Sequence, residues 1–94
     1  MAGKIIWSPR AAENLEDIHH YIAKDSNYYA SLVVKRILEL VKTIPEQPQS
    51  GRIVPEYNND SIREKFYSHY RIIYRIKDEV IEIVAIYHGA RLLK

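Results

Sequence analysis

Residues 62–88, which read IREKFYSHYRIIYRIKDEVIEIVAIYH, decide the fold of this chain. Apolar and polar side chains alternate through much of this stretch with a period of two, which is the spacing of a β-strand with two different faces. The alternation is interrupted around His69 and again at Asp78-Glu79, and short interruptions of this kind are turns between strands. The stretch therefore predicts three consecutive strands in an antiparallel meander.

Two amphipathic helices are expected before this meander. The first spans residues 9–24, because Ser8-Pro9 supplies a capping hydroxyl and a proline suited to the first helical position. The second ends near Ile44, since the following Pro45 disfavours helical geometry in the residue before it. A short connection makes the two helices an antiparallel hairpin. Their apolar positions recur at helical spacing: Ala12, Leu15, Ile18 and Ile22, then Ala30, Val33, Val34, Ile37, Leu38, Val41 and Ile44.

The remaining segments complete the expected architecture. Residues 4–7 are a short β-prone run, and residues 45–60 contain three prolines and a glycine, which predicts a long loop. The element order is then β-α-α-β-β-β. We expect an α+β fold in which the helical hairpin packs on a small antiparallel sheet, and the length predicts a single domain over residues 1–94.

Composition excludes several kinds of site. The 94 residues include no cysteine, which rules out a disulfide framework, a thiolate zinc site and a cysteine nucleophile. We find no phosphate-binding glycine loop and no metal cluster, so neither a cofactor nor a metal is expected. The apolar run near the N-terminus is too short for a signal peptide or a membrane span, which predicts a soluble cytoplasmic protein with no membrane partner.

Charge is unevenly distributed along the chain. The formal net charge is +2, and the surplus lies in residues 51–94, where Lys and Arg outnumber Asp and Glu by eight to six. A local basic surface attracts nucleic acid or an acidic protein. Parity along the strands places most of these side chains on the sheet face turned away from the helices, although a merely solvated charged face remains the alternative. The predicted members of that face are Arg63, Lys65, Arg71, Arg75, Lys77, Glu82 and His88.

Two further residues carry possible acid–base chemistry. The imidazole of His88 titrates near neutral pH and can act as a general acid or base. Glu56 follows Pro55 in the long loop and can act as a base. The competing interpretations are that His88 is an incidental residue at a strand end and that Glu56 is a solvated carboxylate in a loop.

The chain resembles the RelE/ParE superfamily of toxins over nearly its whole length. The order and spacing of several short segments carry the resemblance, and the predicted element order is that of the family. These segments are Trp7-Ser8-Pro9-Arg10-Ala11 with Leu15 and Ile18, Tyr21-Ile22-Ala23, Pro48-Gln49-Ser50-Gly51-Arg52, Ile62-Arg63-Glu64, Tyr70-Arg71-Ile72-Ile73-Tyr74 and Tyr87-His88-Gly89-Ala90-Arg91.

The resemblance implies the toxin of a type II toxin–antitoxin module, of the kind associated with plasmid stabilization. The implied partner is a cognate antitoxin that wraps the toxin, and operator DNA is contacted only through that antitoxin. Two activities occur on this fold. ParE-like members inhibit DNA gyrase by binding, whereas RelE-like members cleave messenger RNA on the ribosome.

For the nuclease activity, the resemblance implies Glu56 as base, Arg63 and Arg71 as phosphate contacts and His88 as acid. The ParE-like branch is favoured, because residues 45–61 contain no lysine and no aromatic residue follows His88. A non-toxic interaction module is a further alternative, so enzymatic activity is left open. The residues expected to contact the target are Arg63, Lys65, Arg71, Arg75, His88 and Arg91.

Overall fold

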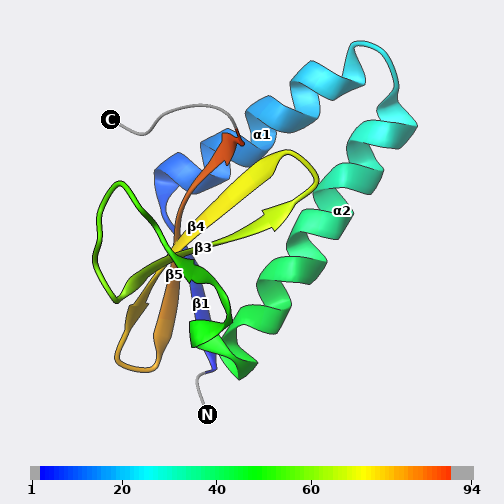
Figure 1. Cartoon of the computed structure of the whole chain (residues 1–94). Coiled ribbons are helices and arrows are strands. Elements are labelled where there is room, and N and C mark those ends of the chain that lie inside the picture. The colour runs from blue at the N-terminus through cyan, green and yellow to red at the C-terminus, as the bar shows by residue number, and fades with distance from the viewer. Residues whose placement is uncertain (1–2, 90–94) are drawn as a thin grey trace.

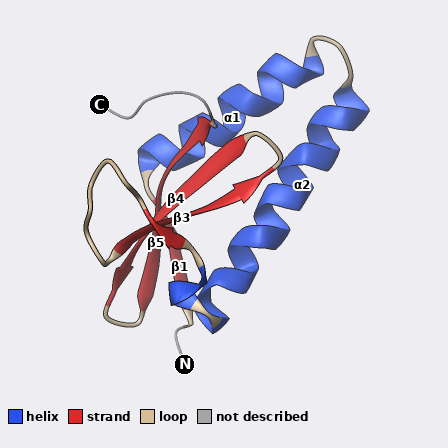
Figure 2. Ribbon diagram, viewed as in Figure 1, coloured by secondary structure: helices blue, strands red, loops and turns tan. Residues whose placement is uncertain are grey.

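The structure is a computed structural model, and it describes residues 3–89. Five strands form one sheet in the order β1-β5-β4-β3-β2, and both helices contribute to one core against it (Figures 1 and 2). Two short 3-10 turns, η1 and η2, follow the second helix. The elements are β1 (Lys4–Trp7), α1 (Pro9–Ala23), α2 (Asn27–Thr43), η1 (Ile44–Glu46), η2 (Pro48–Ser50), β2 (Arg52–Ile53), β3 (Ile62–Tyr67), β4 (Tyr70–Lys77) and β5 (Val80–His88).

The helical hairpin agrees with the sequence prediction to within one residue at the ends that were predicted. The Ser8 hydroxyl caps α1 by accepting a hydrogen bond from the Ala11 amide at 3.0 Å, and Ser26 caps α2 by accepting from the Tyr29 amide at 3.0 Å. Each cap satisfies one of the amide groups that a helix start leaves without a partner. Within residues 3–89, neither helix has the length and apolar character needed to span a bilayer.

The core lies between the helices and one face of the sheet. The apolar stripe predicted for α2 supplies much of the helical side, and alternate positions of β4 and β5 supply the other. The core side chains are at most 3% exposed, so this contact removes them almost completely from water. They are Ala11, Val33, Ile37, Val41, Ile44, Ile72, Tyr74, Ile81, Ile83 and Ile86.

The sheet contains the predicted meander and two additional pairings. Strands β3, β4 and β5 pair antiparallel, as expected. Strand β1 adds to the sheet in parallel beside β5, and β2, within the stretch expected to be a loop, pairs antiparallel with β3. The α+β architecture is therefore confirmed, while the sheet is mixed rather than purely antiparallel. Figure 1 shows the connection between β2 and β3 on the side of the sheet away from α2.

The predicted single basic face does not form, and the β3–β4 turn is the first reason. Only Ser68 and His69 separate these strands, so Tyr67 and Tyr70 lie directly opposite each other and share a face. Arg63 and Lys65 consequently point to the helix side of the sheet, where their partners are core residues of β4. The prediction that they share a face with Arg71 and Arg75 was wrong, because it assigned this hairpin the opposite parity.

A β-bulge in β5 is the second reason. Ile73 pairs with Ala85 whereas Tyr74 pairs with Ile83, so Val84 is an extra residue on β5. Before the bulge, Glu82 lies opposite Arg75 on the open face, defined here as the sheet face away from the helices. After the bulge the parity is reversed, and His88 lies opposite Tyr70 on the helix side. Of the predicted basic residues, the open face keeps Arg71, Arg75 and Lys77.

Candidate functional site

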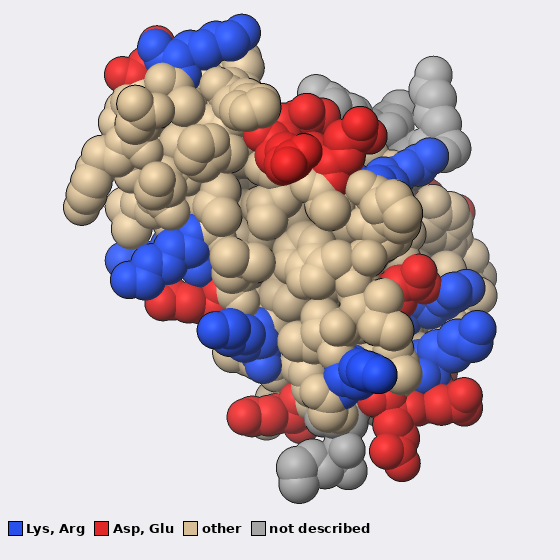
Figure 3. Space-filling model, turned by 180° about the vertical axis from the view of Figure 1, so that it is seen from behind, with Lys and Arg blue, Asp and Glu red and all other residues tan. Residues whose placement is uncertain are grey.

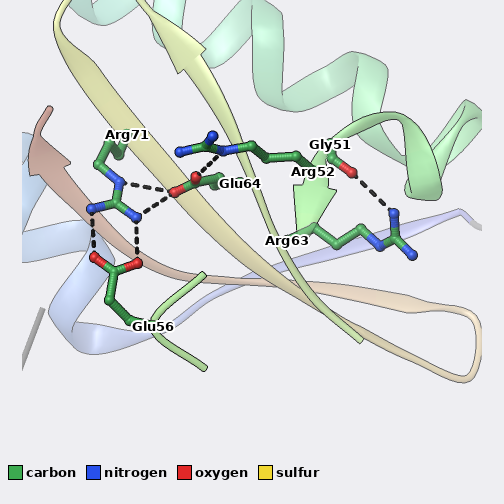
Figure 4. A network of polar contacts seen from close by, with 6 residues as sticks. All are labelled: Gly51, Arg52, Glu56, Arg63, Glu64 and Arg71. Atoms are coloured by element: carbon green, nitrogen blue, oxygen red, sulfur yellow. Dashed lines mark hydrogen bonds and ion pairs between the residues drawn. The ribbon is translucent and has the colours of Figure 1, made fainter. Parts of the chain in front are cut away.

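A buried carboxylate organises the charged residues of the open face. The Glu64 side chain on β3 is fully buried. It accepts hydrogen bonds from Arg71 Nε at 2.8 Å and Arg71 Nη2 at 2.6 Å, and its second oxygen accepts from Arg52 Nε (Figure 4). A buried carboxylate is tolerated only when it is paired and hydrogen-bonded. The two arginines meet this condition, so Glu64 is the centre of an ion network.

Glu56 completes this network from the connection between β2 and β3. Both of its oxygens accept from Arg71, at 3.1 Å from Nη1 and 3.1 Å from Nη2, in a bidentate pair. The hydrogen bond from Arg71 lowers the pKa of Glu56 below its usual value, and the bond to Glu56 correspondingly raises the pKa of Arg71. Arg52, Arg71, Glu56 and Glu64 thus form a neutral set of two cations and two carboxylates, called the Glu64 network below.

Arg63 is separated from this network and holds loops together. Its guanidinium donates to the carbonyl oxygens of Gln49, Gly51 and Asp60 and to the Asp60 carboxylate, all at 3.0–3.2 Å. A guanidinium has five N–H groups, so these four acceptors use nearly all of them. Figure 4 shows Arg63 directed away from Arg71. Its geometry is that of a clamp between η2 and the start of β3.

Packing against Tyr74 explains why the first residue of the Gly51-Arg52 pair is a glycine. The Gly51 amide donates to the Tyr74 hydroxyl at 3.1 Å, and this hydroxyl donates to the Pro48 carbonyl at 2.6 Å. A Cβ on Gly51 would lie 2.5 Å from the Tyr74 hydroxyl oxygen. Tyr74 is fully buried, and burial raises the pKa of its phenol. Only glycine fits where the chain passes this hydroxyl.

The other predicted target-binding residues are dispersed. His88 lies at the end of β5, where its ring stacks on His69 with centroids 5.9 Å apart and meets the edge of Tyr70 at the same distance. Lys65 donates to the Ser50 hydroxyl at 3.0 Å. Arg75 forms a partly exposed pair with Glu82 at 2.8 Å, and Arg91 lies outside the described residues. Of the four residues implied for nuclease chemistry, the structure brings together Glu56 and Arg71.

Comparison with known proteins identifies the family. A family model described as the ParE toxin of the type II toxin–antitoxin system parDE matches residues 5–93. The chain belongs to the ParE toxin family. The match spans both helices, the residues of the Glu64 network and all of the sheet except Lys4 at the start of β1.

A relative with the name of a toxin and several solved structures are similar to this chain. Toxin RelE2 of Caulobacter vibrioides is 30% identical over 90 residues, which are 95% of this chain and 98% of that toxin. Among solved structures, the chromosomal ParDE system of P. aeruginosa has a TM-score of 0.75 at 23% identity and covers 93% of this chain and 96% of its own. The YoeB dimer from Staphylococcus aureus has a TM-score of 0.63 at 23% identity, with 94% and 99% covered. At these identities the structural neighbours show the fold.

Sequence reasoning missed Glu64 and Arg52 in this ParE-family site. The signal for Glu64 was present in the alternation, because the residue stands between Ile62 and Phe66 at positions that share one strand face. A carboxylate at a half-apolar position requires a cationic partner. The partner itself was not predictable, since placing Arg71 on the same face as Glu64 required the true parity of the β3–β4 hairpin.

Proposed function

We propose that this ParE-family toxin arrests growth by binding and inhibiting DNA gyrase, in the manner of ParE-like members, and that it does so in the cytoplasm without hydrolysing RNA. The observation that carries this proposal is the arrangement of the residues implied for nuclease chemistry, which do not converge on one site. Arg63 and Arg71 lie on opposite faces of the sheet. The Arg63 guanidinium donates to the Gly51 carbonyl oxygen and the Arg71 guanidinium to the Glu56 carboxylate. A cleavage site needs these groups converging on one phosphate.

Glu56 is also poorly suited to act as a general base. A general base works best with a pKa near the operating pH. Both Glu56 oxygens accept from Arg71, and that contact lowers rather than raises the pKa of the carboxyl group. The residue is therefore better explained as the partner that holds the β2–β3 connection on the open face.

The surface charge supports the same choice. Binding an RNA backbone draws on several cationic side chains gathered along one surface. Figure 3 shows basic and acidic side chains interspersed around an uncharged centre on the face that it presents. We infer that a protein target fits this toxin better than a nucleic acid. We also infer that a cognate antitoxin binds it, because toxin–antitoxin complexes are among its structural neighbours.

Ribosome-dependent RNA cleavage is the second candidate. It is favoured by the contact of Glu56 with Arg71. On that reading, opening of the Glu56–Arg71 pair would free both groups, and His88→Ala would abolish cleavage in a folded protein.

A pair of assays decides between the two candidates. Purified toxin should block supercoiling by gyrase at stoichiometric amounts and leave messenger RNA intact on programmed ribosomes. Cleaved messenger RNA together with unaffected supercoiling would reject the proposal in favour of the nuclease. Normal growth after inducing the gene alone would reject both candidates and leave a non-toxic interaction module.

A further inference from the structure

Three residues on the open face of the sheet are buried although both helices pack on the other side. Glu64 and Ile73 lie opposite each other on β3 and β4, and each is 1% exposed. Val54 continues β2 by one residue beside Ile62, so it shares the face of Glu64, and it is 0% exposed. Figure 1 shows the connection between β2 and β3 on this side of the sheet. This connection, residues 54–61, therefore covers the open face and is called the lid below.

Both ends of the lid are anchored to the sheet. At the first end, the Val54 amide donates to the Ile62 carbonyl oxygen at 3.2 Å. At the last end, the Ser61 carbonyl oxygen accepts from the Ile76 amide at 2.8 Å. These backbone contacts do not involve the Glu56 side chain. The ends can therefore stay in place when the middle of the lid moves.

Glu56 ties the middle of the lid to the sheet. Its carboxylate accepts from Arg71 Nη1 at 3.1 Å and from Nη2 at 3.1 Å. The next two residues fold back on Val54, whose carbonyl oxygen accepts from the Tyr57 amide at 3.1 Å and from the Asn58 amide at 2.9 Å. The bidentate ion pair therefore joins this folded-back turn to β4.

The two sides of Arg71 differ in how firmly they are held. Towards the sheet, Arg71 donates to the fully buried Glu64 at 2.8 Å and 2.6 Å. Towards the lid, its partner Glu56 has a side chain that is 28% exposed, and residues 55–60 are all exposed. Segments with few buried contacts open locally at a low cost in free energy. The pair should therefore separate by movement of Glu56, while Arg71 stays beside Glu64.

We propose that the lid is a conformational gate on the open face, and that the Glu56–Arg71 pair is the latch that keeps it shut. In the closed state the lid covers Val54, Ile73 and Glu64. In the open state the middle of the lid moves away while its ends and the sheet stay folded, and this surface becomes accessible. Any ligand of the covered surface then binds by shifting the population towards the open state. The gate is a property of the free toxin, so it goes beyond the proposed function and holds for either target.

A single cysteine under the lid can report its opening, because the chain contains no cysteine of its own. Val54→Cys places a thiol beneath the lid. Val41→Cys is the matched substitution at a residue 2% exposed in the core on the helix side, and it reports unfolding of the whole domain. The measurement is the rate at which each thiol reacts with a water-soluble disulfide reagent. Val54→Cys should react faster than Val41→Cys, because it needs local opening alone.

Removal of the latch should open the lid further. Glu56→Ala deletes the carboxylate, and we expect the reaction of Val54→Cys to accelerate by about tenfold or more, because charge-assisted hydrogen bonds are lost. The rate for Val41→Cys should stay the same. Glu82→Ala is the control, since it removes a carboxylate of similar exposure, 30%, from Arg75 on the same face. It should leave the Val54→Cys rate unchanged.

The remaining outcomes would overturn the gate. Equal rates for the two cysteines with Glu56 present would mean that the lid opens only with the whole domain. Equal acceleration by Glu56→Ala would mean that Glu56 supports the entire fold, and no acceleration would mean that it is not a latch. If Val54→Cys does not fold, hydrogen exchange on the cysteine-free chain replaces it. Glu56→Ala should then speed exchange at the Tyr57 and Asn58 amides and not in α2, and unchanged exchange at those two amides would reject the proposal.

Discussion

The β2–β3 edge of the sheet and the tip of the helical hairpin differ in what their polar side chains do. At the edge, Arg63 and Glu64 are adjacent on β3 and point to opposite faces, yet both have their hydrogen bonds satisfied within the chain. At the tip, Tyr21 and Tyr29 are largely exposed. The comparison teaches that charged residues at a sheet edge can be structural, whereas aromatic residues on the helices remain exposed.

Removing the centre of the Glu64 network should have the largest effect on stability. Glu64→Gln keeps the shape of the side chain and deletes its charge, which leaves the buried Arg71 with one carboxylate instead of two. Breaking a buried ion pair by removing one partner costs about 3–5 kcal/mol, and we expect a loss of that order in the free energy of unfolding measured in urea. Glu82→Gln, in the partly exposed pair of the same sheet, is the matched control. Equal losses for the two variants would show that burial at the edge does not matter.

A backbone contact at the same edge should give the next largest effect. The Cβ added by Gly51→Ala would meet the Tyr74 hydroxyl oxygen at 2.5 Å and the Glu64 carbonyl oxygen at 2.7 Å. Forcing an extra methyl group into a packed site costs about 1–3 kcal/mol, which thermal unfolding will detect as a lowered Tm. Gly3→Ala is the control, because nothing lies within 4 Å of the corresponding Cβ. An unchanged Tm for Gly51→Ala would mean that the glycine is not required by packing.

The helices and the order of the elements could be predicted, whereas the charged faces could not. Ser8-Pro9, Ser26 and Pro45 are local signals, and each marks a helix end in the structure. The relation between Arg63 and Arg71 depends instead on the parity across a two-residue turn, and the position of His88 depends on a bulge at Val84. Neither feature leaves a local pattern, because one extra residue reverses the face of every side chain that follows it.

The outer carboxylate of the Glu64 network should make stability depend on pH. The pKa of Glu56 in the folded chain is lowered from its ordinary value of 4.5, first by the hydrogen bond from Arg71. A group with a depressed folded pKa stabilises the protein above its unfolded pKa, and the contribution is lost as pH falls through the folded value. Wild type should therefore be more stable than Glu56→Gln at pH 7, and the difference should shrink below pH 4.5. A difference that stays constant down to pH 3 would contradict the bidentate pair.

The exposed pair on the open face should give the smallest effect. Arg75 and Glu82 are joined at 2.8 Å, and their side chains are 44% and 30% exposed. Exposed ion pairs contribute about 0.2–1 kcal/mol, so a double-mutant cycle with Arg75→Ala and Glu82→Ala should return a coupling energy in that range. Salt screens exposed charges more than buried ones, and the coupling should fall further at 1 M sodium chloride. A coupling as large as the Glu64 loss would mean that solvent exposure does not separate structural from dispensable charges in this toxin.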